Sequence, residues 1–69
     1  MSTGVVKWFN DTKGYGFIVP DDGGKDVFVH FGDIVMDGHK TLKDGQHVQF
    51  SIRDTEDGRV AASEVVVID

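Results

Sequence analysis

Aromatic side chains alternate along two short segments of the sequence. Tyr15 and Phe17 are two residues apart, and so are Phe28 and His30. Because successive side chains of an extended chain point to opposite faces, each pair lies on one face of a strand. Aromatic rings that face away from a core can stack on flat, unpaired nucleobases. The spacing therefore indicates a surface suited to single-stranded nucleic acid.

The alternative is that these rings are ordinary core residues, because aromatic side chains in strands are commonly buried. Two features favour exposure. Ile18, Val27 and Val29 fall on the opposite face and can supply an aliphatic core there. Gly14 and Gly16 flank the first aromatic residue, and glycine in a strand often marks the close approach of another backbone or a ligand. We therefore expect an exposed aromatic surface.

Three further aromatic residues are harder to place by alternation. Trp8 and Phe9 are adjacent, so both cannot share one face unless the strand coils or bulges. We expect Trp8 to be exposed and Phe9 to lie at the edge of the aromatic surface. His30 lies on the aromatic face and can stack or hydrogen-bond, a purely structural role being the alternative. Phe31 points inward by alternation and joins the surface only if the chain turns at Gly32.

The charge of the chain limits how it could bind a polyanion. The formal net charge is −5, which argues against a non-specific binder of the basic-tail kind. Stacking must then dominate, at about 1–3 kcal/mol for each base. Lys7 and Lys13 flank the aromatic residues and can contact phosphates, although surface lysines often serve solubility alone. The acidic residues expected in turns, away from the aromatic residues, are Asp21, Asp22, Asp37, Asp44, Asp54, Glu56 and Asp57.

Arrangements typical of enzymes and metal sites are missing from the sequence. We find no Ser-His-Asp pattern, phosphate-cradling glycine loop or carboxylate pair at the end of a strand. His39 and His47 lack a third ligand nearby, and the chain has no cysteine. We therefore expect no catalytic activity, no bound metal and no cofactor.

The elements that would position the aromatic residues are five short strands. With 69 residues, we expect a single domain over residues 1–69. Glycine and Asp-Gly pairs delimit strand candidates at about residues 4–10, 15–20, 26–31, 46–53 and 59–68. A short helical turn is expected near Asp33 to Val35. This pattern predicts an all-β, five-stranded antiparallel barrel of the oligonucleotide-binding (OB) type.

The last two strand candidates carry most of the remaining apolar residues. Alternation places Val48, Phe50 and Ile52 inward in the fourth strand. In the fifth strand, residues 65–68 are apolar on both faces and leave the register open. No basic start followed by an apolar stretch, and no run long enough to cross a bilayer, is present. We expect a cytoplasmic protein with no membrane partner.

Taken together, the segments resemble those of the bacterial cold-shock proteins over essentially the whole chain. Lys13-Gly14-Tyr15-Gly16-Phe17-Ile18 is similar to the first ribonucleoprotein motif of that family, and Val27-Phe28-Val29-His30-Phe31 to the second. Val6-Lys7-Trp8-Phe9-Asn10 resembles its opening strand. Lys40-Thr41-Leu42 and Gly45-Gln46 match the stretch before its fourth strand.

The resemblance implies a barrel that binds single-stranded RNA and DNA, with a preference for pyrimidine-rich stretches. It also implies the activity of an RNA chaperone or antiterminator, which opposes secondary structure in messages. Carried over to matching positions, the contact residues are Lys7, Trp8, Phe9, Lys13, Tyr15, Phe17, Phe28, His30 and Phe31.

The chain also departs from the family pattern. His39 stands where the family often has an aromatic residue, and residues 57–62 lack the usual Gly-Pro-Gln before the alanines. We count His39 and Arg59 as candidate contacts at these two places. Residues 36–38 and 41–43 resemble stationary-phase paralogues, which are associated with dimerisation and inhibition of DNA replication. Besides that alternative, a small barrel that binds a protein through the same aromatic patch stays open, as a monomer or weak dimer.

Overall fold

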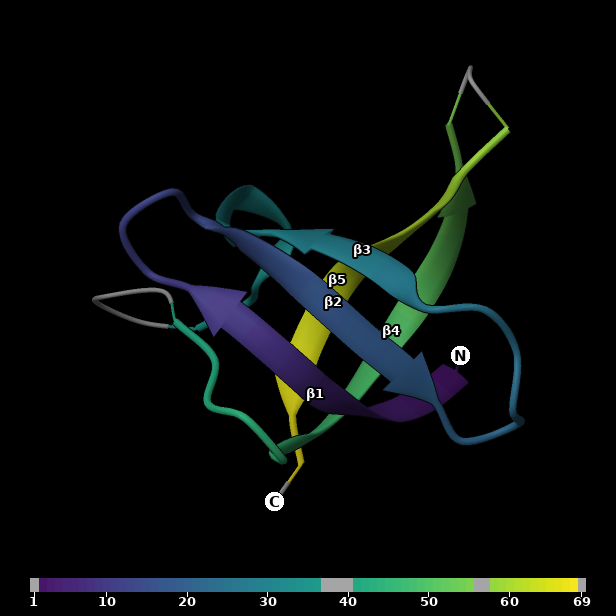
Figure 1. Ribbon diagram of the computed structural model, residues 1–69, viewed down its shortest axis with the longest axis horizontal. Helices are drawn as coiled ribbons and strands as arrows, with labels where there is room; N and C mark the ends of the chain where they lie inside the picture. Colours follow the sequence, from purple (N-terminus) through teal and green to yellow (C-terminus); the bar gives the residue numbers. More distant parts are fainter. Residues whose placement is uncertain (1, 37–40, 56–57, 69) are drawn as a thin grey trace.

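The protein is a small closed barrel, seen here in a computed structural model that describes residues 2–36, 41–55 and 58–68. Its elements are β1 (Ser2–Asn10), β2 (Tyr15–Pro20), β3 (Val27–His30), the 3₁₀ helix η1 (Phe31–Asp33), β4 (His47–Asp54) and β5 (Val60–Val67). The strand order around the barrel is β1-β2-β3-β5-β4, and β1 pairs with β4 to close it. In Figure 1, β1, β2 and β3 lie side by side in front of β4 and β5.

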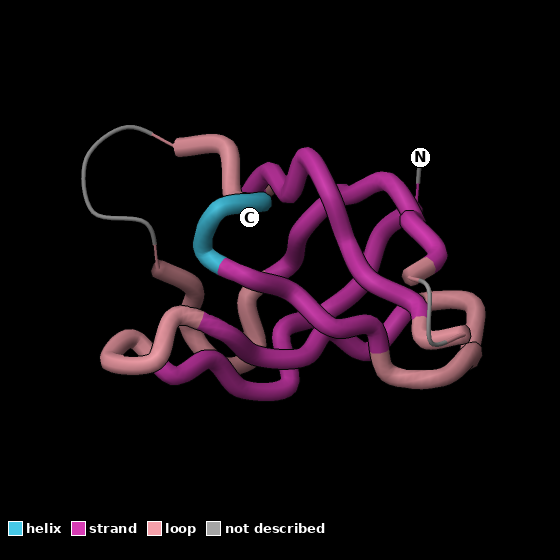
Figure 2. The backbone as a smooth tube through the Cα atoms, turned by 90° about the horizontal axis from the view of Figure 1, so that it is seen from above, coloured by secondary structure: helices cyan, strands magenta, loops and turns pink. Residues whose placement is uncertain are grey.

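The strand pairings confirm the predicted all-β OB-type barrel. Neighbouring strands are antiparallel, except that β3 and β5 run parallel and pair at Phe28 and Ala61. The strand bounds differ from the predicted ones by two residues at the start of β1 and by one or none elsewhere. Viewed at right angles to Figure 1, the loops gather at the two ends of the barrel (Figure 2).

The core lies inside the barrel and consists of aliphatic residues and one phenylalanine. As alternation predicts, the β2 and β3 side chains opposite the aromatic residues are buried. In β5, Val65 is buried and Val67 packs against the core, whereas Val66 is exposed, as is Ile68 directly after the strand. These positions decide which face of the fifth strand is turned inward. The buried apolar residues are Val6, Ile18, Val27, Val29, Ile34, Leu42, Val48, Phe50, Ala61, Ala62 and Val65.

A β-bulge at Lys7 changes which face of β1 carries the aromatic residues. Val6 pairs with Ile18, and Trp8 pairs with Phe17, so Lys7 is an extra residue without a partner on β2. By simple alternation Trp8 would share the inward face of Val6. The bulge reverses the alternation, because an extra residue shifts every later side chain to the other face. Trp8 therefore faces outward.

The prediction that Ile52 points inward in β4 is wrong, because its side chain is 50% exposed. The pairing of β1 with β4 ends at Ser2 and Phe50, so β4 continues past the closed part of the barrel. Figure 1 shows this end of β4 extending beyond the other strands. Ile52 thus lies beyond the part of β4 that pairs with β1, which accounts for its exposure.

The helical turn also lies earlier than predicted, at Phe31–Asp33 instead of near Asp33 to Val35. The Nδ1 atom of His30 accepts a hydrogen bond from the Gly32 N–H at 3.2 Å and caps the turn. Figure 2 shows this short helix directly after β3. Among the described residues, no helix is long and apolar enough to cross a membrane.

Candidate nucleic-acid interface

Four aromatic rings form one connected group on the outer face of β1, β2 and β3. The ring of Trp8 lies 5.8 Å from that of Tyr15 and 5.4 Å from that of Phe17, measured between centroids. Phe28 lies 5.9 Å from Tyr15 and 5.8 Å from Phe17. All four side chains are half-buried, whereas their strand neighbours Val6, Ile18, Val27 and Val29 are buried. The structure thus brings together the rings that the sequence pattern placed on one face.

The angles between these rings explain how they are held in place. Trp8 meets Tyr15 and Phe17 edge to face, at 70° and 63°, and Phe17 meets Phe28 at 73°. Such contacts contribute about 0.5–1.5 kcal/mol for each pair beyond the burial of area. The neighbouring rings already restrict each side chain. Stacking a base on such a ring therefore loses less side-chain entropy than stacking a base on a ring that is free to rotate.

His30 and Phe31 extend this group at the end of β3. Their rings lie 4.5 Å apart, and His30 is the register partner of Tyr15 on β2. Phe31 is 47% exposed, so the inward position given by alternation is wrong. The chain leaves the strand conformation at Phe31, where η1 begins, and alternation no longer applies. We call the set Trp8, Tyr15, Phe17, Phe28, His30 and Phe31 the aromatic platform.

Gly14 and Gly16 serve packing within the barrel. Gly14 has φ +78°, and a Cβ atom there would lie 2.7 Å from Cδ1 of Phe31. The N–H of Phe31 donates a hydrogen bond of 2.8 Å to the Gly14 carbonyl. A Cβ atom on Gly16 would lie 2.7 Å from Cα of Phe9 on the paired strand. The close approach expected at both glycines is therefore made by the protein's own residues.

Lys7 and Lys13, the predicted phosphate contacts, are both exposed at the margin of the platform strands. The Nζ atom of Lys7 forms an ion pair of 3.0 Å with Oδ2 of Asp26 in the β2–β3 connection. Asp26 thus lies close to the site, although we expected the acidic residues elsewhere. The backbone N–H of Lys13 donates to Oδ1 of Asn10, which fixes the β1–β2 turn.

Three other predicted site residues are not members of the platform. Phe9 was expected at the edge of the aromatic surface. It instead pairs with Gly16 and packs against the core. Arg59 is exposed just before β5, and its backbone exchanges hydrogen bonds with Thr55. His39 falls outside the described residues, as do two of the three residues, 37 and 38, that gave the stationary-phase resemblance in that loop.

A groove of about 200 Å³ adjoins the platform and was not foreseen from the sequence. Its lining residues are Phe17, Lys25, Asp26, Phe28, Gly58, Arg59 and Val60. They come from β2, β3, β5 and the connections before β3 and β5. Lys25, directly before the second aromatic segment, is the sequence signal that could have pointed here.

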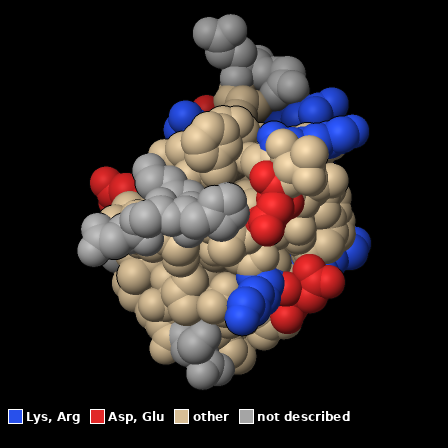
Figure 3. Space-filling view, turned by 90° about the vertical axis from the view of Figure 1, so that its left-hand side faces the viewer, with Lys and Arg blue, Asp and Glu red and all other residues tan. Residues whose placement is uncertain are grey.

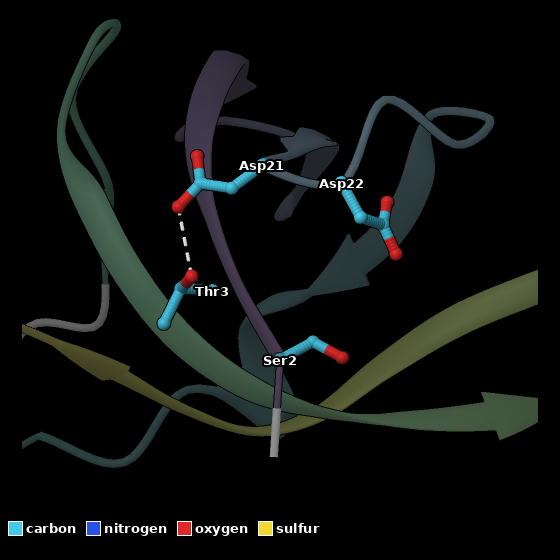
Figure 4. A pocket seen from close by; sticks show the side chains of 4 residues that line it. All are labelled: Ser2, Thr3, Asp21 and Asp22. Atoms are coloured by element: carbon cyan, nitrogen blue, oxygen red, sulfur yellow. Dashed lines mark hydrogen bonds between the residues drawn. The ribbon is translucent and has the colours of Figure 1, made fainter.

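A second hollow is lined by Ser2, Thr3, Asp21 and Asp22, at the start of β1 and the end of β2. The hydroxyl of Thr3 donates a 2.7 Å hydrogen bond to Asp21, and the carboxylate of Asp22 points away from that pair (Figure 4). It contains no aromatic ring for stacking. In the described part of the chain, no group of three or more residues could hold a metal ion.

Acidic and basic side chains are interspersed on the side of the molecule drawn in Figure 3. The described residues on that side do not form one continuous basic field, which is the kind of field that attracts a protein non-specifically to nucleic acid. Attraction of a polyanion to the protein must then depend on a few local cations, because the chain as a whole has net charge −5.

A closed five-stranded barrel with aromatic rings on the outer face of three strands defines an OB-type nucleic-acid-binding domain. The chain belongs to the cold-shock domain family, because the family model described as 'Cold-shock' DNA-binding domain matches residues 2–68. Cold-shock proteins bind single-stranded nucleic acid and are not enzymes, which confirms the expectation of a binding protein without catalytic activity.

Several curated relatives carry cold-shock names. The chain is 57% identical to Cold shock-like protein CspC of Buchnera aphidicola subsp. Acyrthosiphon pisum, over 87% of both chains. It is 58% identical to Cold shock-like protein CspA of Vibrio cholerae, over 87% of this chain and 86% of the relative. It is 53% identical to Cold shock-like protein CspG of Shewanella violacea, over 96% of this chain and 94% of the relative.

Among solved structures, drosophila Unr CSD456 superposes with a TM-score of 0.80 at 18% sequence identity. The match covers 99% of this chain and 26% of that one. At this identity the likeness establishes the shared fold alone.

Proposed function

We propose that the protein binds single-stranded RNA and DNA by stacking unpaired bases on the aromatic platform. The observation that supports this proposal is the connected group of half-buried rings on the outer face of β1, β2 and β3. Stacking tolerates different bases, because every base has a π face. We infer a preference for pyrimidine-rich strands from the family resemblance.

Local cations supplement the stacking in this proposal. Lys7, Lys13 and Arg59 contact phosphates, and each adds a screened, modest contribution. Lys7 is already paired with Asp26, and an exposed ion pair of this kind is worth only about 0–1 kcal/mol. A phosphate can therefore bind Lys7 beside the carboxylate of Asp26, or in place of it, at little cost in free energy.

The biological activity that follows is that of an RNA chaperone or antiterminator in the cytoplasm. A protein that binds open strands and does not bind duplex shifts the equilibrium toward the open form by mass action. This requires neither a cofactor nor an energy source.

A titration of Trp8 fluorescence with a short oligo-thymidine tests the proposal. Trp8 is the only tryptophan and lies within the platform, so its emission reports on the proposed site. We expect saturable quenching by the single strand and none by a duplex of equal length, with only mild sensitivity to salt. If no single strand of RNA or DNA quenches Trp8 or changes its emission, the proposal fails, and the protein-binding alternative takes its place.

A further inference from the structure

The side chain of His30 caps the short turn that carries Phe31. Its Nδ1 atom accepts the hydrogen bond of 3.2 Å from the Gly32 N–H, and the Nδ1–Cε1 edge of the ring faces Gly32. Phe31 is the first residue of η1, and its ring lies 4.5 Å from the imidazole. The N–H of Phe31 is bound separately, by the Gly14 carbonyl at 2.8 Å. The start of the turn is thus held by the β1–β2 turn, whereas the backbone after Phe31 depends on His30.

This cap requires one protonation state of the imidazole. A ring nitrogen that accepts a hydrogen bond carries no proton, so the neutral ring of His30 holds its proton on Nε2. In the charged ring both nitrogens are donors, and two donors would then face each other across 3.2 Å. The ring must turn away, and the Gly32 N–H loses its acceptor. Acid therefore removes the cap of η1.

The side chain of His30 is exposed, and among the described residues it forms no ion pair and no hydrogen bond with a charged side chain. Asp33, the acidic residue of η1, is paired with Arg53 at 3.4 Å. A proton on the imidazole thus acts first on the hydrogen bond to Gly32. The charged or titratable side chains on the elements around His30 are Asp11 and Lys13 in the β1–β2 turn, Tyr15 on β2, Asp33 in η1 and Glu64 on β5.

We propose that His30 positions Phe31, and that protonation of His30 releases Phe31 and weakens the binding of single strands. Histidine side chains ordinarily change charge between about pH 5 and pH 8. A ring that has lost its support must be ordered by the base that stacks on it, and this ordering lowers the affinity. The inference rests on the proposed function and adds a dependence on pH to it.

The test uses variants that separate the cap from the charge. His30→Asn keeps an acceptor, because asparagine is among the preferred N-cap residues, and it cannot titrate. His47→Gln is the matched control, because it removes an exposed imidazole at the start of β4, outside the platform, and leaves His30 in place. Each protein is compared with itself between about pH 7.5 and pH 5.5, the range in which histidine changes charge.

The first measurement needs no nucleic acid. Nitrogen NMR of the wild-type protein should show the neutral ring of His30 protonated on Nε2. The amide signal of Gly32 should move as the pH falls, and it should stay in place in His30→Asn. A ring protonated on Nδ1, or a Gly32 signal that does not respond to pH, would show that His30 does not cap the turn.

The second measurement is the affinity for oligo-thymidine. The affinity of the wild type and of His47→Gln should fall by about two- to tenfold over this range, which is the effect expected from losing a side-chain cap. His30→Asn should lose this dependence. The salt slope should be the same at both pH values, because no phosphate contact is gained or lost.

Three results of the binding measurement would overturn the proposal. An equal fall in His30→Asn would assign the pH dependence to other groups. A rise in affinity in acid, with a salt slope steeper by about 0.7, would show that the charged imidazole contacts a phosphate instead of releasing Phe31. Both results would leave binding at the platform intact. If the wild-type protein binds no single strand at either pH, the proposed function fails and this proposal fails with it.

Discussion

Phe17, Phe28 and Phe50 have the same side chain in two different surroundings. Phe50 is fully buried in the barrel core. Phe17 and Phe28 are half-buried, and each contacts other rings of the platform. Truncation to alanine should therefore separate binding from stability.

We expect Phe17→Ala and Phe28→Ala each to weaken binding of oligo-thymidine by about 1–3 kcal/mol, or roughly 5- to 150-fold, while the barrel stays folded. Phe50→Ala should instead lower the free energy of unfolding by about 3–5 kcal/mol, because it leaves a cavity in the core. Binding is measured by anisotropy of a labelled strand, and stability by urea unfolding. Unfolding of the two platform variants, with no loss of affinity in their folded fraction, would show that these rings are core residues.

Gly14 and Gly23 provide a second comparison at the residue scale. Both have positive φ, +78° and +82°, but a Cβ atom meets Phe31 at Gly14 and open space at Gly23. Gly23→Ala should lower the free energy of unfolding by about 1–2 kcal/mol through the left-handed conformation alone. Gly14→Ala should cost more and should also weaken strand binding, because it displaces Phe31. Equal losses of stability and unchanged binding in both variants would remove the role given to Gly14.

Alternation placed most of the platform correctly, and its failures have local causes. Tyr15, Phe17 and Phe28 lie in regular strands, where a period of two holds. Phe31 lies where the strand ends, so the same period gave the wrong face. The ion pair of Lys7 with Asp26 joins residues 19 positions apart, and nothing in their local sequence indicates that the β2–β3 connection brings Asp26 next to β1.

At the scale of elements, two bulges set the register of the barrel. The bulge at Lys7 turns Trp8 outward and leaves Phe9 facing Gly16 and the core. The sequence showed only that two adjacent aromatic residues could not share a face. It did not show where the extra residue lies, because a bulge depends on pairing with β2. The segment boundaries were predictable because glycine and Asp-Gly pairs mark them.

The second bulge contains Glu64, which has φ +52°, the only described residue other than glycine with a positive φ. It lies where Gln49 pairs with Val66 but Ser51 pairs with Ser63, so β5 has one extra residue. Glycine adopts this conformation without steric cost. We expect Glu64→Gly to raise the free energy of unfolding by about 0.5–1 kcal/mol in urea unfolding.

Ser63→Gly is the matched control for this prediction, because Ser63 lies in the same strand without a positive φ. Glycine there should lower stability by about 0.5–1 kcal/mol, since it only increases the entropy of the unfolded chain. A loss of stability in both variants would mean that the conformation of Glu64 carries no strain that glycine relieves.

At the scale of the whole molecule, an acidic protein must bind a polyanion mainly through contacts that salt does not screen. With two or three phosphates neutralised, the logarithm of the binding constant should fall with the logarithm of salt at a slope of about −1.5 to −2. The measurement is a set of Trp8 titrations over a range of salt concentrations. A much steeper slope would assign the affinity to cations and leave little for the platform.

The opening of structured strands should follow from the same binding, in proportion to the protein present. Each bound molecule stabilises the open form by RT ln(1 + [L]/Kd), about 2.7 kcal/mol when the free protein is a hundred times Kd. A hairpin with a fluorophore and a quencher at its ends should therefore open progressively as protein is added, without a nucleotide cofactor. Phe17→Ala should shift this curve to higher protein concentration by the factor found for its loss of affinity. Opening that occurs at substoichiometric protein, or that Phe17→Ala leaves unchanged, would contradict a mechanism based on mass action at the platform.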